Sequence, residues 1–248
     1  MRYPFLIVIL FCLGCAPKEL DDCFKTGGDL VTENVTVAAF SKIRFEDDII
    51  LEIAQGDVQE VRVTTGQNLL DQVVVSVQDQ TLVLQDNTSC NLVRDYGLTT
   101  IRVTTPILTE IRNSSAYDVR GIGRLSFPEL VLRSDSSGGV TDSRKSGDFY
   151  LDLDCEDLIV QANGLSVFYL TGTTTHAAIS FADEYPRFEG RLLAIDSLTL
   201  FHRGANTMIV NPQQSIKGRI LATGDVLSVS RPAVVQVSEE FTGRLIFE

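Results

Sequence analysis

Three aspartates with even spacing are the residues of this chain whose types and positions could best do chemistry. On a β-strand, the side chains of Asp148, Asp152 and Asp154 would all point to one face, because alternate residues share a face. Clustered carboxylates can hold Ca²⁺, or can serve as acid and base in the hydrolysis of a sugar polymer. A solvated strand face is the simpler interpretation, and we favour it. The sequence therefore predicts an acidic binding cluster at most, and no catalytic residue.

A polar insertion precedes this cluster. The apolar runs that begin at Leu130 and Leu158 are 28 residues apart, whereas similar runs elsewhere recur every 20 to 22 residues on average. The insertion and its flanks mix acidic and basic side chains, which are Asp135, Asp142, Arg133, Arg144 and Lys145. Insertions in repeat proteins project from one face and often bind ligands, although a simple exposed loop is the interpretation we favour.

The remaining reactive residue types show no catalytic or metal-binding pattern. The two histidines, His176 and His202, do not accompany a serine or cysteine nucleophile motif, and we expect His202 to be a solvated loop residue. No CxxC pair or His-rich spacing indicates zinc, and no glycine-rich loop indicates a nucleotide. The sequence therefore predicts a protein that is not an enzyme and has no metal or cofactor.

Of the five cysteines, three follow Cys15 in a chain that is expected to reach an oxidising compartment. Cys23 and Cys90 flank the two ends of one N-terminal block, so they are the natural disulfide pair there. Such a bridge would close a loop of 67 residues. Cys155 is left over, and we expect it to be a buried, unreactive thiol that faces the interior.

The N-terminus has the pattern of an export signal. Arg2 precedes an apolar run over residues 5–13, which is shorter than the about 20 residues of a membrane span. The run ends in Leu13-Gly14-Cys15, which resembles a bacterial lipobox, although Cys12 stands where an aliphatic residue is usual. The resemblance implies a signal peptide over residues 1–14, lipid on Cys15 and an acidic tether over 15–28. An ordinary secretory signal is the alternative.

The composition limits the partners. The net charge of −12 disfavours nucleic acid and anionic membrane surfaces as electrostatic partners, although excess acid is also ordinary for a soluble surface. Tryptophan is absent. Within an N-terminal block of residues 29–107, the stretch from 29 to about 91 carries apolar side chains at every second position, the pattern of half-buried strands. This N-terminal β block is expected to precede a repetitive segment.

Residues 108–248 repeat a short β-type run followed by a small polar turn. The runs begin at Leu108, Leu130, Leu158, Leu198 and Ile220, with a weaker copy at Ala177. Repeats of about 20 residues are typical of solenoids, in which each coil buries its apolar face against the next. The sequence thus predicts an all-β, solenoid-like stack of short strands. Its aromatic residues are expected mainly in the core, although an outer stripe could stack on sugars.

Several N-terminal segments together resemble a known family. These are 23–29 (CFKTGGD), 40–43 (FSKI), 51–56 (LEIAQG), 66–70 (GQNLL), 82–84 (LVL), 89–91 (SCN) and 101–108 (IRVTTPIL). They resemble the "putative auto-transporter adhesin, head GIN domain" family of Bacteroidetes-type lipoproteins. The resemblance covers almost all of the chain after the signal. It implies a right-handed parallel β-helix, a lipid anchor and an adhesive or envelope function, and it supports the Cys23–Cys90 bridge. The later turns depart from the family pattern, as at 182–186.

These observations predict a non-enzymatic, lipid-anchored envelope protein of the bacterial outer membrane, either surface-exposed or facing the periplasm. Its solenoid surface would bind a protein or a glycan. Two alternatives remain: an enzyme that acts on polysaccharides, and a periplasm-facing structural protein. The apolar segment 244–248 could be a final strand or a packing seam, so a homo-oligomer is also considered.

Overall fold

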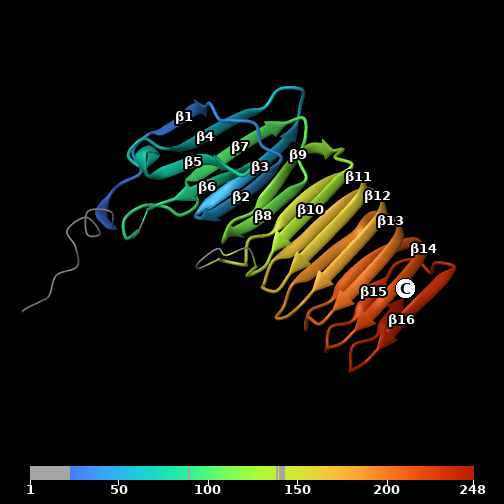
Figure 1. Cartoon of the computed structure of the whole chain (residues 1–248). Coiled ribbons are helices and arrows are strands. Elements are labelled where there is room, and N and C mark those ends of the chain that lie inside the picture. The colour runs from blue at the N-terminus through green and yellow to red at the C-terminus, as the bar shows by residue number, and fades with distance from the viewer. Residues whose placement is uncertain (1–22, 89, 138, 140–142) are drawn as a thin grey trace, which may run out of the picture.

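The computed structural model describes residues 23–88, 90–137, 139 and 143–248 (Figure 1). The predicted signal peptide, Cys15 and most of the predicted tether lie outside these residues. The strands are β1 (Leu30–Val35), β2 (Lys42–Asp47), β3 (Ile49–Gln55), β4 (Glu60–Gly66), β5 (Val73–Gln78), β6 (Thr81–Asp86), β7 (Thr99–Thr105), β8 (Glu110–Ser115), β9 (Val119–Leu125), β10 (Glu129–Ser134), β11 (Phe149–Ala162), β12 (Val167–Phe181), β13 (Arg187–His202), β14 (Met208–Ile220), β15 (Val226–Ser228), β16 (Val234–Glu239) and β17 (Leu245–Phe247). The all-β prediction is confirmed.

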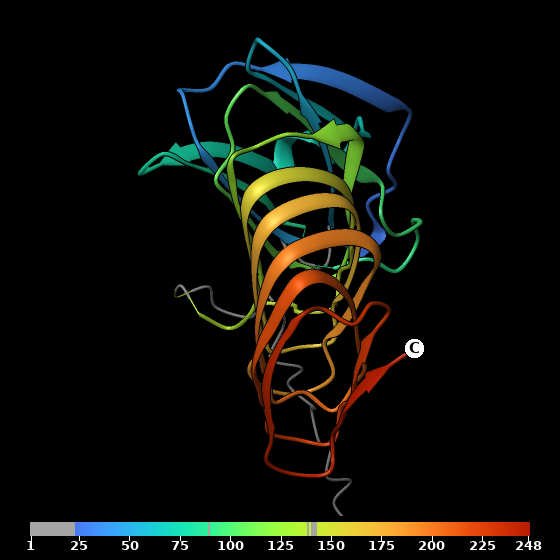
Figure 2. The same cartoon turned by 90° about the vertical axis from the view of Figure 1, so that its right-hand side faces the viewer.

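From β8 onward the chain winds in successive coils with two strand-bearing sides (Figure 2). The A face contains β8, β10, the C-terminal halves of β11 to β14, and β16. The B face contains β9, the N-terminal halves of β11 to β14, β15 and β17. A long strand such as β11 passes from one face to the other: residues 149–153 pair with β9, and residues 157–162 pair with β10. All pairings within this C-terminal stack are parallel.

The core fills the space between the two faces. Apolar residues alternate with outward ones along each strand, and the strand phenylalanines Phe149, Phe168, Phe181 and Phe188 are fully buried. The rings of Phe149 and Phe168 stack with centroids 4.6 Å apart. The outward residues include the stacked pair Tyr150 and Tyr169, which are 41% and 39% exposed. The expectation that aromatics fill the core therefore holds for these phenylalanines and fails for this tyrosine pair.

The N-terminal block joins the stack with its strands out of chain order. On the A face β2 lies between β6 and β8, and on the B face β3 lies between β7 and β9. The chain therefore passes from β7 to β8 across the coil that β2 and β3 form. Antiparallel strands complete the block, because β4 pairs with β7, β1 pairs with β4, and β5 pairs with β6. They cover strand edges that would otherwise be open to other chains.

The register of the stack corrects two of the predicted repeats. Glu110 is opposite Val131, which places Thr109 rather than Leu108 opposite Leu130. Leu130, Leu158, Ala177 and Leu198 occupy equivalent positions on the A face, as the spacing predicted. The next equivalent residue is Ile216, whereas Ile220 pairs with His202, so the repeat expected to begin at Ile220 begins four residues earlier. The reason is Gly218, which interrupts the apolar alternation. A Cβ there would lie 1.9 Å from the Leu200 carbonyl oxygen, and its φ of +135° favours glycine.

Candidate binding face

The three aspartates that the sequence singled out do not act as one group. Asp152 Oδ2 lies 3.2 Å from Arg124 Nε, and Asp154 Oδ1 accepts a hydrogen bond of 3.1 Å from the Thr173 hydroxyl. Both project from the B face. Across the described part of the chain, no group of three or more His, Cys, Asp or Glu side chains is arranged to hold a metal ion.

Asp148 lies in the turn before β11 and connects coils. Its Oδ1 accepts a hydrogen bond of 2.7 Å from the backbone N–H of Val167 in the next coil. Asp118 and Asp225 make equivalent bonds to the backbone N–H groups of Asp148 and Arg244. Burial raises the pKa of the Asp148 carboxyl, and the nearby Asp118 charge raises it further. Asp148 therefore stabilises the stacking of consecutive turns.

The cysteines lie in two different environments. Cys23 and Cys90 form a disulfide across 67 residues of the N-terminal block. Cys155 is a free thiol buried inside the stack, and burial, with a smaller contribution from Asp154, raises its pKa to about 11. Little thiolate exists at neutral pH at that pKa, and the thiolate is the reactive form.

The two histidines also differ. His176 is exposed, and its Nδ1 lies 3.2 Å from Asp157 Oδ1. His202 ends β13 and has no exposed surface, so the expectation of a solvated loop histidine is wrong. Its Nε2 lies 2.9 Å from the Asn206 carbonyl oxygen, while Nδ1 has no partner among the described residues. Burial lowers the pKa of His202. The strand continues one residue further than the apolar run over 198–201 suggested, and the following turn covers the ring.

A groove of about 560 Å³ crosses the outer A face near the start of its strands. Its floor is apolar, because Val131, Ile159 and Ala178 occupy equivalent positions on β10, β11 and β12. Acidic Glu129 and Asp157 stand among its walls. A neighbouring hollow of about 310 Å³ lies over the turns at 106–109 and 127–129. Sequence reasoning missed this groove, since only the strand register brings its floor residues together.

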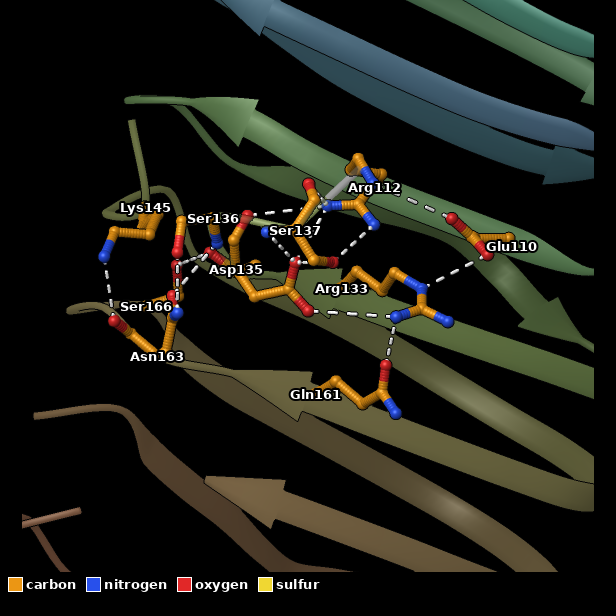
Figure 3. A network of polar contacts seen from close by, with 11 residues as sticks. Glu110, Arg112, Arg133, Asp135, Ser136, Ser137, Lys145, Gln161, Asn163 and Ser166 are labelled. Carbon is orange, nitrogen blue, oxygen red and sulfur yellow. Dashed lines mark hydrogen bonds and ion pairs between the residues drawn. The ribbon is translucent and has the colours of Figure 1, made fainter. Parts of the chain in front are cut away.

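The insertion forms a polar shelf at the other end of these strands, over residues 135–137 (Figure 3). Arg112, whose side chain is only 8% exposed, holds this shelf in place. Nη1 of this arginine lies 2.9 Å from Asp135 Oδ1 and donates to the Ser137 carbonyl at 2.8 Å. Burial alone would raise the pKa of Asp135, but the hydrogen bonds from Ser137 and Arg112 outweigh it and lower that pKa.

Arg133 completes the shelf together with Glu110 and Gln161. Its Nε lies 3.3 Å from Glu110 Oε2, its Nη1 lies 3.8 Å from Asp135 Oδ2, and the same Nη1 donates to Gln161 Oε1. A hollow of about 450 Å³ lies between the shelf and the ends of β11 and β12. The sequence identified Asp135 and Arg133 through the long repeat interval, whereas Asp142 lies outside the described residues.

The far end of the insertion is tied to both regions of the molecule. The guanidinium of Arg144 pairs with Asp48 of the N-terminal block, and its backbone N–H donates to the Ser114 carbonyl at 3.1 Å. Lys145 Nζ reaches the Asn163 carbonyl at 2.9 Å and Glu184 Oε1 at 3.0 Å. Arg112 therefore holds the shelf, while Arg144 and Lys145 fix the chain where it leaves the insertion.

Comparisons with known proteins agree with this architecture. A crystal structure of a putative adhesin from Bacteroides fragilis is 20% identical, covers 90% of this chain and 99% of its own, and superposes with a TM-score of 0.79. Two structures from Parabacteroides distasonis, a putative adhesin and a putative lipid binding protein, are each 14% identical. They cover 89% and 88% of this chain and 98% and 96% of their own, with TM-scores of 0.63 and 0.61. At these identities the likeness establishes a shared fold.

No curated protein sequence matches the chain. The described part of the structure contains no helix with the length and apolar character needed to cross a membrane. A family model, described as "Putative auto-transporter adhesin, head GIN domain", matches residues 39–232. Because that match covers most of the chain, the protein belongs to this family, the "Putative auto-transporter adhesin, head GIN domain" family.

Proposed function

We propose that this protein is an adhesin-like component of the bacterial cell envelope that binds a protein or glycan partner through its outer A face. The observation that carries the proposal is the apolar groove on that face, bordered by the fixed polar shelf. A flat ladder of side chains repeated at each coil suits an extended or repetitive partner. The membership in an adhesin family supports the same function.

The stack fits a right-handed parallel β-helix or solenoid, with residues 29–107 as its N-terminal block and 108–248 as its repeats. Sequential parallel pairing from β10 to β17 supports this interpretation. The anchor is proposed to be lipid on Cys15, after removal of residues 1–14, with 15–28 as a tether. The disulfide between Cys23 and Cys90 supports an exported location.

Two other functions have less support. An enzyme acting on polysaccharides would need convergent carboxylates, whereas Asp148, Asp152 and Asp154 each have a separate partner. A periplasm-facing structural protein would not need a groove. Self-association through segment 244–248 also stays a proposal; Leu245–Phe247 forms β17, which pairs with β15.

The first test is exposure of intact cells to a protease that does not cross the outer membrane. Cleavage of the C-terminal stack is expected for a surface adhesin. Protection until the outer membrane is broken would favour the periplasm-facing alternative and contradict the adhesin. Loss of radiolabelled lipid incorporation in Cys15→Ala is the accompanying test of the anchor.

The second test measures adhesion of the cells to immobilised glycans and matrix proteins. Ala178→Phe places a large ring in the groove at an outward position, so it should reduce adhesion with little effect on folding. Ala233→Phe adds the same ring at an exposed position outside the groove and is the matched control. Equal adhesion of both variants and the native protein would remove the groove from the proposal.

A further inference from the structure

The hollow beside the shelf presents an unusual set of hydrogen-bonding groups. Arg133, Gln161 and Ser180 lie at equivalent positions on β10, β11 and β12, so their side chains form one outward ladder. All three line the hollow of about 450 Å³. Adjacent strands are about 4.8 Å apart, so neighbouring members of the ladder can contact one small ligand together.

The groups of this ladder that have no side-chain partner can all donate hydrogen bonds, although the Ser180 hydroxyl can also accept. Nη2 of Arg133 has no partner among the described residues, whereas its Nε and Nη1 are engaged by Glu110 and Gln161. Because Gln161 Oε1 accepts from Arg133, the amide orientation is fixed and Gln161 Nε2 is left to donate outward (Figure 3). The Ser180 hydroxyl also has no side-chain partner in the described part of the chain.

The acceptors of Asp135 and Asn163 at the edge of the hollow face partners within the protein, and Asp135 Oδ2 lies 3.8 Å from Arg133 Nη1. Asp135 Oδ1 accepts from Arg112 and Ser137, and Asn163 Oδ1 accepts from the Ser136 N–H at 3.1 Å. A ligand that fits must therefore supply acceptors. Two N–H donors side by side, one of them on a guanidinium, match the two oxygens of a carboxylate.

The apolar floor of the groove adjoins this ladder. Val131, Ile159 and Ala178 precede Arg133, Gln161 and Ser180 by two residues on the same strands, a separation of about 7 Å on one face. A ligand that covers both strips carries an apolar face beside its carboxylate. A pyranose ring with a carboxylate at one edge has this chemistry.

We propose that the Arg133–Gln161–Ser180 ladder is a binding site for uronic-acid residues of an acidic glycan. This inference rests on the proposed adhesive function and names its ligand class. Glu110 and Asp135 neutralise Arg112 and Arg133, and the chain is acidic overall, so binding depends on short-range geometry rather than long-range attraction. Single sites of this kind are weak, and many copies on one cell bind a repetitive glycan with higher avidity.

The test is calorimetric titration of the purified chain with tetragalacturonate, with its methyl ester, and with tetraglutamate. The ester keeps the rings and removes the charge, and the peptide keeps the charge and removes the rings. Binding of tetragalacturonate alone is expected. Equal binding of the ester would overturn the carboxylate assignment, and equal binding of tetraglutamate would overturn the sugar and point to an acidic peptide.

Two variants locate the site. Gln161→Glu keeps the acceptor for Arg133 but replaces the free donor with a negative charge, and Arg133→Gln removes the guanidinium. Each should weaken tetragalacturonate binding at least about tenfold, the effect of losing a hydrogen bond to a charged group. Arg219→Gln removes one positive charge on β14, four strands beyond Arg133 on the same face, and should leave binding unchanged.

A similar loss in Arg219→Gln would show that the effect is one of net charge and would overturn the site. Absence of binding by the native chain would overturn the inference while leaving the adhesion and protease results to decide the proposed function separately.

Discussion

In the N-terminal block, β2 pairs with strands that lie far along the chain, since Lys42 is opposite Glu110. In the C-terminal stack, each strand pairs with its neighbours in sequence, as Phe149 does with Phe168 only 19 residues later. The stack is therefore built from local contacts that repeat. In the block only β5 and β6 pair as a local hairpin, and the other strands pair with segments distant in the chain. The stability of a repetitive stack is approximately the sum of the energies of its coils and of the contacts between neighbouring coils. The block, in contrast, should unfold as one cooperative unit.

Substitutions that create a large cavity in each region should distinguish local unfolding of the stack from cooperative unfolding of the block most strongly. Phe168→Ala in the stack and Phe45→Ala in the block each remove a fully buried ring and should cost about 3–5 kcal/mol of unfolding free energy. Hydrogen exchange should show loss of protection confined to nearby coils for Phe168→Ala, and spread over β1 to β7 for Phe45→Ala. Identical, global patterns for both would contradict the distinction.

The disulfide between Cys23 and Cys90 should stabilise the N-terminal block but not the C-terminal stack. Replacing Cys23 and Cys90 with serine should destabilise the block by up to about 4 kcal/mol, because the bridge closes a loop of 67 residues in the unfolded chain. Denaturant unfolding of native and variant protein would measure this difference. Cys155→Ser is the control outside the loop. A loss of protection in β12 to β17 as large as in the block would contradict a local role.

The stack should respond to acid through His202. Burial lowers the pKa of His202 in the folded state. The unfolded chain therefore binds more protons than the folded chain once the pH falls below the ordinary histidine pKa of about 6.5. The histidine contribution to stability is therefore complete above that pH and declines as pH falls.

Thermal unfolding between pH 7 and 5 measures the effect. His202→Gln should lose stability less steeply on acidification than the native protein does, while exposed His176→Gln should follow the native slope. Parallel slopes for all three proteins would show that His202 is not the source.

The smallest effect is expected for the acidic residues that first suggested chemistry. Asp152→Asn breaks the pair with Arg124, whose side chains are 39% and 56% exposed, and should change the unfolding free energy by less than about 1 kcal/mol. Asp148→Asn keeps an oxygen for the Val167 N–H, so it should also fold. A loss of several kcal/mol in Asp152→Asn would show that the carboxylate has a structural role not visible in its contacts.

Pattern in the sequence was informative where the structure depends on neighbouring residues. Alternation from Val35 to Leu84 indicated the strands of the block, and the recurrence of Leu130, Leu158, Ala177 and Leu198 indicated equivalent positions in the stack. The long interval after Leu130 indicated the insertion that became the shelf. Pattern failed at Ile220 because Gly218, required by a close backbone approach, interrupts the alternation.

The sequence by itself determined the strand-forming segments, their apolar faces and the length of each coil, because these depend on side chains two residues or one turn apart. Only the tertiary structure decided that β2 and β3 insert between β6–β7 and β8–β9, that His202 is covered, and that Arg133, Gln161 and Ser180 align. The physical reason is that strand order and register are set by burial of whole faces against distant segments, which no local pattern specifies.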